Sequence, residues 1–414
     1  MKHRRHPPIL RPLHLAIAVA ATLASLQPAT ATIFPSPGPY WNAIEIAPAN
    51  GLSNQLVPHA LNDAGWVVGS FNDAGGDRGF IWSGVSGHVP QRLPLSDAWG
   101  IRPDGTVLGA ALGSSLRREG FTSLTGREYA VQVAPNGAIT VLTPTNLTTN
   151  NAGQTFGMAF AANAAGTVVG VSTDAAGQYG AALWSGGSSP SFIDISTGSR
   201  PGGFLGGRSS LAINDAGTVV GGTHQLQTWS AAQGRTDLGG LTLATSTSGA
   251  DINNAGLIVG TSSFSDGLSN GFIYRPDTAS FTVLSGLGGQ GTGSSAASAL
   301  NERGDVVGLS GVVGRVDSRA TWWKPGGEVV DLNRLNFTNL SGVRLQTAID
   351  INNRGQILVS GMRENSLGQI TDTGMRHWVL TLCERCGQIA PYPNATGTTL
   401  DIGPDWYDAF NDLT

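Results

Sequence analysis

One short pattern recurs seven times along this chain of 414 residues. The fourth copy shows it most fully, as Ala-Ile-Asn-Asp-Ala-Gly-Thr-Val-Val-Gly over residues 212–221. The other copies occupy residues 60–69, 100–109, 161–170, 251–260, 299–308 and 350–361, and the second of the seven is the most altered. Repetition at a period of tens of residues indicates a repeat architecture, in which each copy is one unit that is stable only against its neighbours.

The spacing of asparagine and glycine inside the pattern predicts a hairpin. Both residues adopt the left-handed backbone conformation at low cost, so Asn-x-x-Gly ends one strand, turns, and lets the glycine open the next strand. Consecutive apolar residues such as Val219 and Val220 indicate that this second strand is covered on both faces. The structural turn residues expected on this basis are Asn62, Gly65, Asn163, Gly166, Asn214, Gly217, Asn253, Gly256, Asn301, Gly304, Asn352 and Gly355.

Two further strands complete each unit. After each hairpin comes a loop of variable length and then a strand with an aromatic residue, replaced by Val133 in the second copy. The aromatic residues are Trp82, Trp184, Trp229, Tyr274, Trp323 and Trp378. A turn and a fourth strand, such as residues 328–332, follow. Because the aromatic strand is internal to its unit, we expect these side chains in the core rather than on a carbohydrate-binding platform.

Four strands in each of seven units predict an all-β fold, a seven-bladed β-propeller of four-stranded antiparallel blades. From His59 to Leu382 the units average about 46 residues, which is close to the length of a propeller blade. The 59 glycines and the 13% of charged residues also favour many short strands joined by tight turns. An open β-solenoid is the alternative. Its coils are usually evenly spaced, whereas the turn glycines here lie 39 to 61 residues apart.

The two ends of the repeat array complement each other. The seventh copy stops after its third strand, residues 376–382, whereas a spare strand, residues 41–46, precedes the first hairpin. Antiparallel pairing of these two strands would supply the missing fourth strand of the last unit. It would also close the ring and remove exposed sheet edges that invite aggregation. We therefore expect the N-terminal strand to close the propeller.

The N-terminus has the three parts of a secretory signal peptide. Lys2, Arg4 and Arg5 precede an apolar run over residues 15–26, and Ala-Thr-Ala ends at residue 31. The run is too short to span a bilayer, so no transmembrane anchor is expected. We expect a protein that is secreted to the periplasm or to the extracellular space. Its predicted parts are the signal peptide over 1–31, the propeller domain over 32–382 and a C-terminal tail over 383–414.

The repeats resemble those of the HAF family, a class of extracellular repeat proteins named for a His-Ala-Phe motif. The resemblance rests on residues 212–221 with their sister segments, and on third strands such as 79–82 and 271–274; it covers about four-fifths of the chain. The His-Ala-Phe motif itself is replaced, for example by Arg-Gly-Phe at 78–80 and Asn-Gly-Phe at 270–272. The resemblance implies an exported bacterial protein with propeller-like repeats, and it supplies no catalytic residue.

The charge of the chain excludes two classes of partner. Removal of residues 1–31 takes away four basic residues and no acid, which lowers the formal net charge from -4 to -8. Binding to nucleic acid or to an anionic membrane requires a basic surface, so neither is expected. The histidines that remain are scattered over different copies, so no metal site or other cofactor is expected. They are His59, His88, His224 and His377.

The only two cysteines of the chain lie close together, as Cys383-Glu-Arg-Cys386, just after the last strand. A redox motif would stand beside a thioredoxin-like unit, and a zinc site would need two more ligands. Neither context is present in the sequence. In an oxidising exported environment we therefore expect a local disulfide between Cys383 and Cys386.

Two classes of function fit the sequence. The first is a secreted or cell-envelope non-enzymatic repeat protein, a monomer, that binds an unknown extracellular protein or glycan. The second is an exported hydrolase or lyase that acts on a glycan or another extracellular substrate. Enzymatic propellers concentrate acids, histidines or arginines on corresponding loops, and this sequence has no such concentration, so we expect no enzyme activity. The expected binding surface is a loop of the second copy, with Arg117, Arg118 and Phe121.

Overall fold

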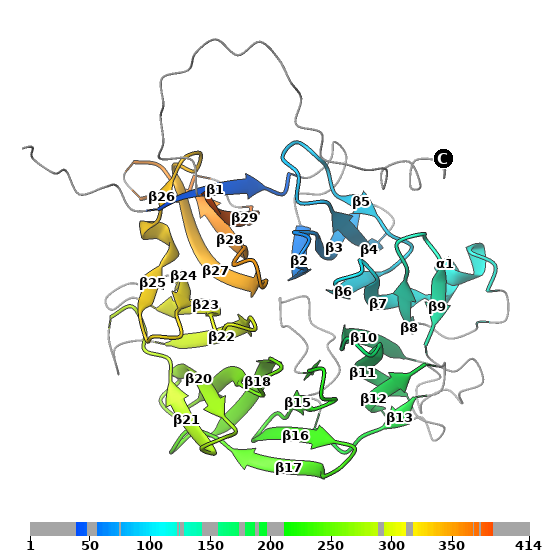
Figure 1. The fold of residues 1–414 in the computed structure, drawn as a ribbon. Helices are drawn as coiled ribbons and strands as arrows, with labels where there is room; N and C mark the ends of the chain where they lie inside the picture. The colour runs from blue at the N-terminus through cyan, green and yellow to red at the C-terminus, as the bar shows by residue number, and fades with distance from the viewer. Residues whose placement is uncertain are drawn as a thin grey trace, which may run out of the picture. The chain divides into compact units, whose positions relative to one another are not determined.

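The strands of the computed structural model form seven sheets that follow one another around a ring (Figure 1). The structure describes residues 39–47, 56–73, 76–121, 124, 128–142, 156–173, 179–186, 190–196, 211–288, 294–311, 318–366, 368–371 and 374–383. We number the sheets blade 1 to blade 7 in chain order. The predicted seven-bladed propeller is confirmed, whereas the proposed signal peptide and nearly all of the C-terminal tail lie outside the described residues.

Blades 1 to 4 each contain four consecutive strands. Blade 1 consists of β2 (Leu56–Leu61), β3 (Val67–Asp73), β4 (Gly76–Trp82) and β5 (Gln91–Arg92). Blade 2 consists of β6 (Asp97–Ile101), β7 (Val107–Leu112), β8 (Glu128–Val133) and β9 (Ile139–Val141), with helix α1 (Gly113–Arg118) between β7 and β8. Blade 3 consists of β10 (Gly157–Ala162), β11 (Thr167–Thr173), β12 (Tyr179–Ser185) and β13 (Ser191–Phe192). Blade 4 consists of β14 (Ala212–Ile213), β15 (Val219–Gly221), β16 (Leu226–Ser230) and β17 (Gly234–Gly239).

The remaining blades include the one that joins both ends of the repeat array. Blade 5 consists of β18 (Ser246–Ile252), β19 (Ile258–Ser263), β20 (Ser269–Arg275) and β21 (Ser280–Val283). Blade 6 consists of β22 (Ser295–Leu300), β23 (Val306–Gly311), β24 (Ser318–Trp323) and β25 (Val329–Asp331). A 3-10 helix, η1 (Leu332–Arg334), and β26 (Asn336–Phe337) lead onward. Blade 7 consists of β27 (Val343–Ile351), β28 (Ile357–Arg363), β29 (Arg376–Cys383) and β1 (Tyr40–Glu45).

Blade 7 is completed by β1, the first strand of the described residues. β1 pairs antiparallel with β29 along its whole length, from Tyr40 opposite Cys383 to Glu45 opposite Trp378. The closure predicted from the two ends of the repeat array is thus confirmed, and the open solenoid is ruled out. β26 adds a fifth strand that the sequence did not predict, because it pairs parallel with β1, with Tyr40 opposite Asn336.

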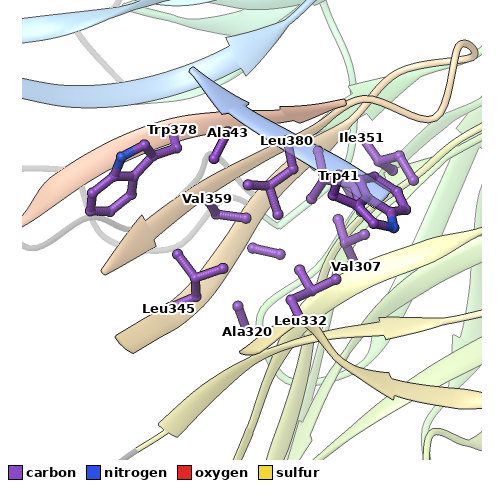
Figure 2. Packing of buried hydrophobic residues seen from close by; sticks show 13 residues of the cluster. Trp41, Ala43, Val307, Ala320, Leu332, Leu345, Ile351, Val359, Trp378 and Leu380 are labelled. Atoms are coloured by element: carbon purple, nitrogen blue, oxygen red, sulfur yellow. The ribbon is translucent and has the colours of Figure 1, made fainter. Parts of the chain in front are cut away.

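Apolar side chains of β1 and β29 join those of blades 6 and 7 in one core cluster. Figure 2 shows Trp41 of β1 and Trp378 of β29 flanking aliphatic residues such as Val359 and Leu380. Full burial of one indole ring contributes about 4 to 6 kcal/mol before conformational entropy is subtracted. The N-terminal strand is therefore held by its core packing as well as by its backbone pairing.

The hairpin of each repeat has the expected turn. In blade 4 the amide of Gly217 donates to the carbonyl oxygen of Asn214 over 3.0 Å. Gly217 has a φ of +78°, a conformation that glycine adopts without strain. The second strand that follows is buried on both faces, with Val219 and Val220 inaccessible to solvent. Figure 1 places the first strand of each blade toward the centre of the ring and the fourth strand outside.

The glycine that ends the repeat pattern meets a different requirement. In blade 6 the first strand has a bulge between Ala297 and Ala299, opposite β23. There a Cβ atom on Gly308 would overlap the carbonyl oxygen of Ala296. The bulge brings the two backbones so close that only glycine fits. Gly69, Gly109, Gly170, Gly260 and Gly361 face a carbonyl oxygen of their own first strand in the same way.

The aromatic residues of the third strands lie in the core, as the sequence predicted. Trp82, Trp184 and Trp378 are among the largest fully buried side chains of the described residues, whereas Trp229 is only half-buried. These indoles are therefore not available as a carbohydrate platform. Over the described part of the chain, we find no helix with both the length and the apolar character needed to cross a membrane.

Candidate functional site

The turn asparagines connect neighbouring blades. In blade 4 the Oδ1 atom of Asn214 accepts the amide of Thr218 at 3.0 Å, which holds the turn locally. Its Nδ2 atom donates to the carbonyl oxygen of Asn253 in blade 5 at 3.2 Å. The carbonyl acceptors are Arg102 for Asn62, Asn214 for Asn163, Asn253 for Asn214, Asn301 for Asn253, Asn352 for Asn301 and Asn62 for Asn352. We call the side of the ring that carries these turns the turn face.

The residue after each asparagine makes a second series of bonds between blades. Asp215 accepts the amide of Ala164 at 2.7 Å. Similarly, Asn254 accepts from Asp215, Glu302 from Asn254, Asn353 from Glu302 and Asp63 from Asn353. Blade 2 has Pro103 at this position, which carries no side-chain acceptor and no amide proton. This role was not predicted from the sequence, although five of the seven copies have a polar residue at this position.

Aromatic residues from three successive blades meet at the first strands. They are His59, Trp99 and Phe160, each at the bulge position three residues before the turn residue. The His59 ring stacks on the Trp99 ring at 4.3 Å between centroids. Trp99 in turn meets Phe160 edge-on at 5.7 Å. These aromatic residues occupy the same position of the repeat, so the sequence could have indicated the cluster. Only three of the seven copies have an aromatic residue at that position, which makes the pattern hard to recognise.

His59 also contacts a carboxylate and a hydroxyl group. Its Nε2 atom lies 3.2 Å from Oδ1 of Asp97 and 3.4 Å from Oγ of Ser70. A Ser-His-Asp relay requires the hydroxyl and the carboxylate at opposite ring nitrogens, because the proton enters at one nitrogen while the other is held. Here both groups approach the same nitrogen. The trio is therefore arranged to join blades 1 and 2 rather than to activate Ser70.

His377 lies deeper, between blades 7 and 1. Its Nδ1 atom is 2.7 Å from Oγ of Ser360, and its Nε2 atom is 2.7 Å from the carbonyl oxygen of Leu56. Because a carbonyl can only accept, Nε2 carries the proton and Nδ1 accepts from the Ser360 hydroxyl. Burial is the main cause that lowers the pKa of His377 from 6.5 to about 4; the Leu56 hydrogen bond acts in the opposite direction, and the nearby His59 adds a smaller lowering effect. His377 is thus neutral at neutral pH.

These residues form what we call the seam cluster, defined as His59, Ser70, Asp97, Ser360 and His377. His59 and His377, two of the four histidines that are scattered along the sequence, come together in it, one from blade 1 and the other from blade 7. Within the described residues no group of three or more histidine, cysteine, aspartate or glutamate side chains is placed to hold a metal ion.

The predicted binding loop is partly helical and partly packed. Arg117 and Arg118 end helix α1, and Nη1 of Arg117 donates to the carbonyl oxygen of Leu124 at 2.6 Å. Phe121 packs against the core cluster of blade 2 and is half-buried. Arg117 and Arg118 are both exposed to solvent.

The cysteine pair lies at the edge of the described residues. Cys383 is the last residue of β29 and is disulfide-bonded. Cys386, the other cysteine of the chain, lies outside the described residues.

Leu243 and Ala279 are the two non-glycine residues with a positive φ in the described part of the chain, and both are exposed. Leu243 lies in the connection from blade 4 to blade 5, where the amide of Ala244 donates to the carbonyl oxygen of Leu241 at 3.0 Å. Leu243 thus occupies the third position of a tight turn, with a φ of +68°. Its side chain is 87% exposed. The connection enters β18 at the end opposite its Asn-x-x-Gly turn, on the side of the ring that we call the loop face.

No protein-family model and no curated protein matches the chain. Among solved structures, it is similar to a virginiamycin B lyase from Staphylococcus aureus, with 10% identity, a TM-score of 0.45, and coverage of 83% of this chain and 100% of that chain. It is similar to the β-propeller domain of the Trilobed protease from Pyrococcus furiosus, with 8% identity, a TM-score of 0.42, and coverage of 78% and 95%. It is also similar to a fucose-specific lectin from Aleuria aurantia, with 12% identity, a TM-score of 0.30, and coverage of 86% of this chain and 98% of that chain. Such distant likenesses carry no conclusion about activity.

Proposed function

We propose that the chain is an exported, non-enzymatic propeller that binds an extracellular protein or glycan through its loop face. The observation that carries this proposal is Leu243, which combines a positive φ with an almost fully exposed apolar side chain. A left-handed conformation costs a leucine roughly 1 to 2 kcal/mol. Because the side chain of Leu243 is exposed, no burial of apolar surface offsets this cost. Strain of this kind concentrates at sites that contact ligands.

The ring provides rigid support for such a contact. The amide of Thr245 donates to the carbonyl oxygen of Ser263 at 2.8 Å, which fixes the connection against blade 5. The hydrogen bonds between turns tie blade 5 to both of its neighbours. A binding residue on a loop with rigid support loses little conformational entropy when a partner arrives.

The hydrolase or lyase alternative has weaker support. The seam cluster contains the groups that hydrolysis would use, but Ser70 and Asp97 both approach Nε2 of His59. Ser360 has a base with a pKa of about 4, and both Ser360 and His377 are buried. A base this weak removes a serine proton poorly at neutral pH.

Binding can be measured with the labelled full chain on cell walls and extracellular polysaccharide from the producing organism. We expect saturable binding that Leu243→Ser weakens by about tenfold or more, since burial of a leucine contributes roughly 1.5 to 3 kcal/mol. Val89→Ser is the matched control, because Val89 is also an exposed apolar residue but lies in the turn after β4, on the turn face. Equal weakening by both variants would contradict the proposal. Release of reducing ends or unsaturated sugars would favour the hydrolase or lyase.

Export is tested separately. The tripartite N-terminus predicts that the exported chain begins at Thr32. Protein sequencing of the material outside the cytoplasm should read Thr-Ile-Phe-Pro first. Recovery of chains that retain Met1 in the cytosolic fraction alone would show that residues 1–31 are not a signal peptide.

A further inference from the structure

His377 stands at the place where the ring closes. It belongs to β29, and its carbonyl oxygen accepts the amide of Ile46, just beyond the end of β1, at 2.9 Å. Its ring binds Ser360 of β28 on one side and the carbonyl oxygen of Leu56 in β2 on the other. One buried residue thus links the closing strand, the rest of blade 7 and the first strand of blade 1.

The neutral ring satisfies both of its neighbours. Nε2–H donates to Leu56, and Nδ1 accepts from the hydroxyl of Ser360. A proton added at Nδ1 would turn that nitrogen into a donor and force the Ser360 hydroxyl to find another acceptor. It would also place a charge on a residue that is only 5% exposed. The closed seam therefore favours the uncharged form of His377.

The charged groups on the blade 7 side do not offset such a charge. Glu45 of β1 is engaged by two arginines, with Oε1 2.8 Å from Nη1 of Arg376 and Oε2 3.3 Å from Nη2 of Arg363. A carboxylate already shared by two cations gives a third one little stabilisation.

On the blade 1 side, His59 opposes protonation of His377. His59 of β2 repels a proton on His377 when it is itself charged, and it lowers the pKa of His377. The carboxylate beyond it, Asp97, lies 3.2 Å from His59 and is engaged there. Protonation of His377 in the closed ring is thus opposed by its burial and by His59.

We propose that His377 makes the seam between blades 7 and 1 acid-sensitive, so that acidification opens the ring at β1. An opened seam exposes the imidazole to water, where it takes up a proton readily. By linkage, the proton then favours the open state over the closed one. An exported protein that meets an acidic medium would in this way loosen its closing strand while the other blades stay intact.

The pH window follows from the two protonation constants. The pKa of His377 is about 4 in the closed ring and 6.5 when the ring is exposed. Because the folded pKa is the lower one, closure is fully favoured above pH 6.5, loses stability as the pH falls, and changes no further below about pH 4. At pH 5 the ratio of open to closed seams should be roughly 30 times its value at pH 7.5.

Hydrogen exchange of the full chain, corrected for the intrinsic exchange rates at each pH, measures this ratio at single amides. We expect the opening constant of the β1 amides to rise roughly 30-fold from pH 7.5 to pH 5, while amides of β18 and β19 in blade 5 change little. His377→Gln should abolish the rise, because its amide can donate to Leu56 and accept from Ser360 without titrating. His88→Gln is the matched control and should keep the rise, since His88 binds Ser83 outside the seam.

A direct titration keeps the proposal testable even if His377→Gln does not fold. Nuclear magnetic resonance of the histidine ring carbons in the full chain should show one ring that stays neutral down to about pH 4. A His377 ring that titrates near its ordinary pKa of 6.5 would overturn the proposal. So would a β1 opening constant that is independent of pH, or one that rises equally in His377→Gln.

Discussion

Glycine occurs at two fixed positions of each repeat for different physical reasons. Gly217 in the turn has a positive φ and open space around its Cα, so a side chain there would meet strain but no obstacle. Gly308 in the second strand has the opposite problem, because a Cβ would overlap the carbonyl oxygen of Ala296. Strain at Gly217 would stay within one residue. At Gly308, an added Cβ could be accommodated only if the two strands moved apart.

Alanine substitutions should therefore cost different amounts at the two glycines. We expect Gly217→Ala to lower the free energy of unfolding by about 1 kcal/mol, the cost of one left-handed residue. Gly308→Ala should lower it by about 3 kcal/mol, since the hairpin at the bulge must open. Denaturant unfolding of both variants measures the difference. Equal losses, or a larger loss for Gly217→Ala, would show that the close approach of β22 and β23 is not what keeps Gly308.

The turn asparagine can be separated into its local and its interblade bond. Asn214→Asp keeps the acceptor for Thr218 but replaces the donor to Asn253 with a buried carboxylate oxygen facing a carbonyl. We expect a loss of about 2 to 3 kcal/mol, because unmatched polar groups are left buried. In Asn136→Asp, at an exposed turn with only a local bond to Ala138, stability should hardly change. If Asn214→Asp were as mild as Asn136→Asp, the interblade bond would not contribute.

Only half of this residue-level role was predictable. The Asn-x-x-Gly spacing indicates a turn, because the bond from Asn214 to Thr218 lies within the motif itself. The acceptor of the Nδ2 group of Asn214 is the carbonyl oxygen of Asn253, which is 39 residues away. This hydrogen bond therefore depends on how neighbouring blades pack, and the motif alone does not predict it. The seam cluster escaped prediction for the same reason, since His59 and His377 lie on strands that meet only when the ring is closed.

At the scale of elements, β1 is paired on both of its edges. β29 pairs with one edge of β1. The other edge pairs with β26 and, beyond it, forms hydrogen bonds with the side chain of Asn339. Nδ2 of Asn339 donates to the carbonyl oxygen of Ala43 at 2.7 Å, and Oδ1 accepts the Ala43 amide at 2.9 Å. The pairing with β29 was predictable from the missing fourth strand. The pairing with β26 was not, because two residues show no strand periodicity.

Removal of the Asn339 side chain should expose one edge of β1 selectively. In Asn339→Ala the Ala43 amide loses its acceptor, and its hydrogen exchange should speed up by tenfold or more, as expected for a lost bond of about 1.4 kcal/mol. The amides of Asn42 and Ile44 face β29 by strand alternation and should keep their protection. Asn336→Ala, an exposed change in β26 itself, is the control. Faster exchange at all three amides would mean that β1 detaches as a whole.

At the scale of the molecule, the closing strand joins residues more than 330 positions apart in the chain. The sequence predicted this contact because the last repeat lacks its fourth strand and one strand before the first repeat has no partner, so pairing the two completes the blade. The entropy of closing such a long loop grows only logarithmically with its length, so the separation itself adds little cost. Without β1, the described contacts between the first and last blades are side-chain packing and hydrogen bonds that involve side chains, among them those of Asp350, Asn352, Asn353 and His377 to blade 1.

A chain that starts at Val57 should therefore behave differently from one that starts at Thr32. The shorter chain lacks Trp41 from the core cluster that blades 6 and 7 share, and Glu45 from its ion pairs with Arg363 and Arg376. It also leaves β29 as an exposed edge, and exposed edges recruit other chains. We expect it to aggregate or to unfold over a broad temperature range, while the longer chain melts in one cooperative transition as a monomer. Scanning calorimetry and light scattering on both chains measure this. A shorter chain that remains monomeric and melts at the same temperature would show that pairing of β1 with β29 does not hold the ring together.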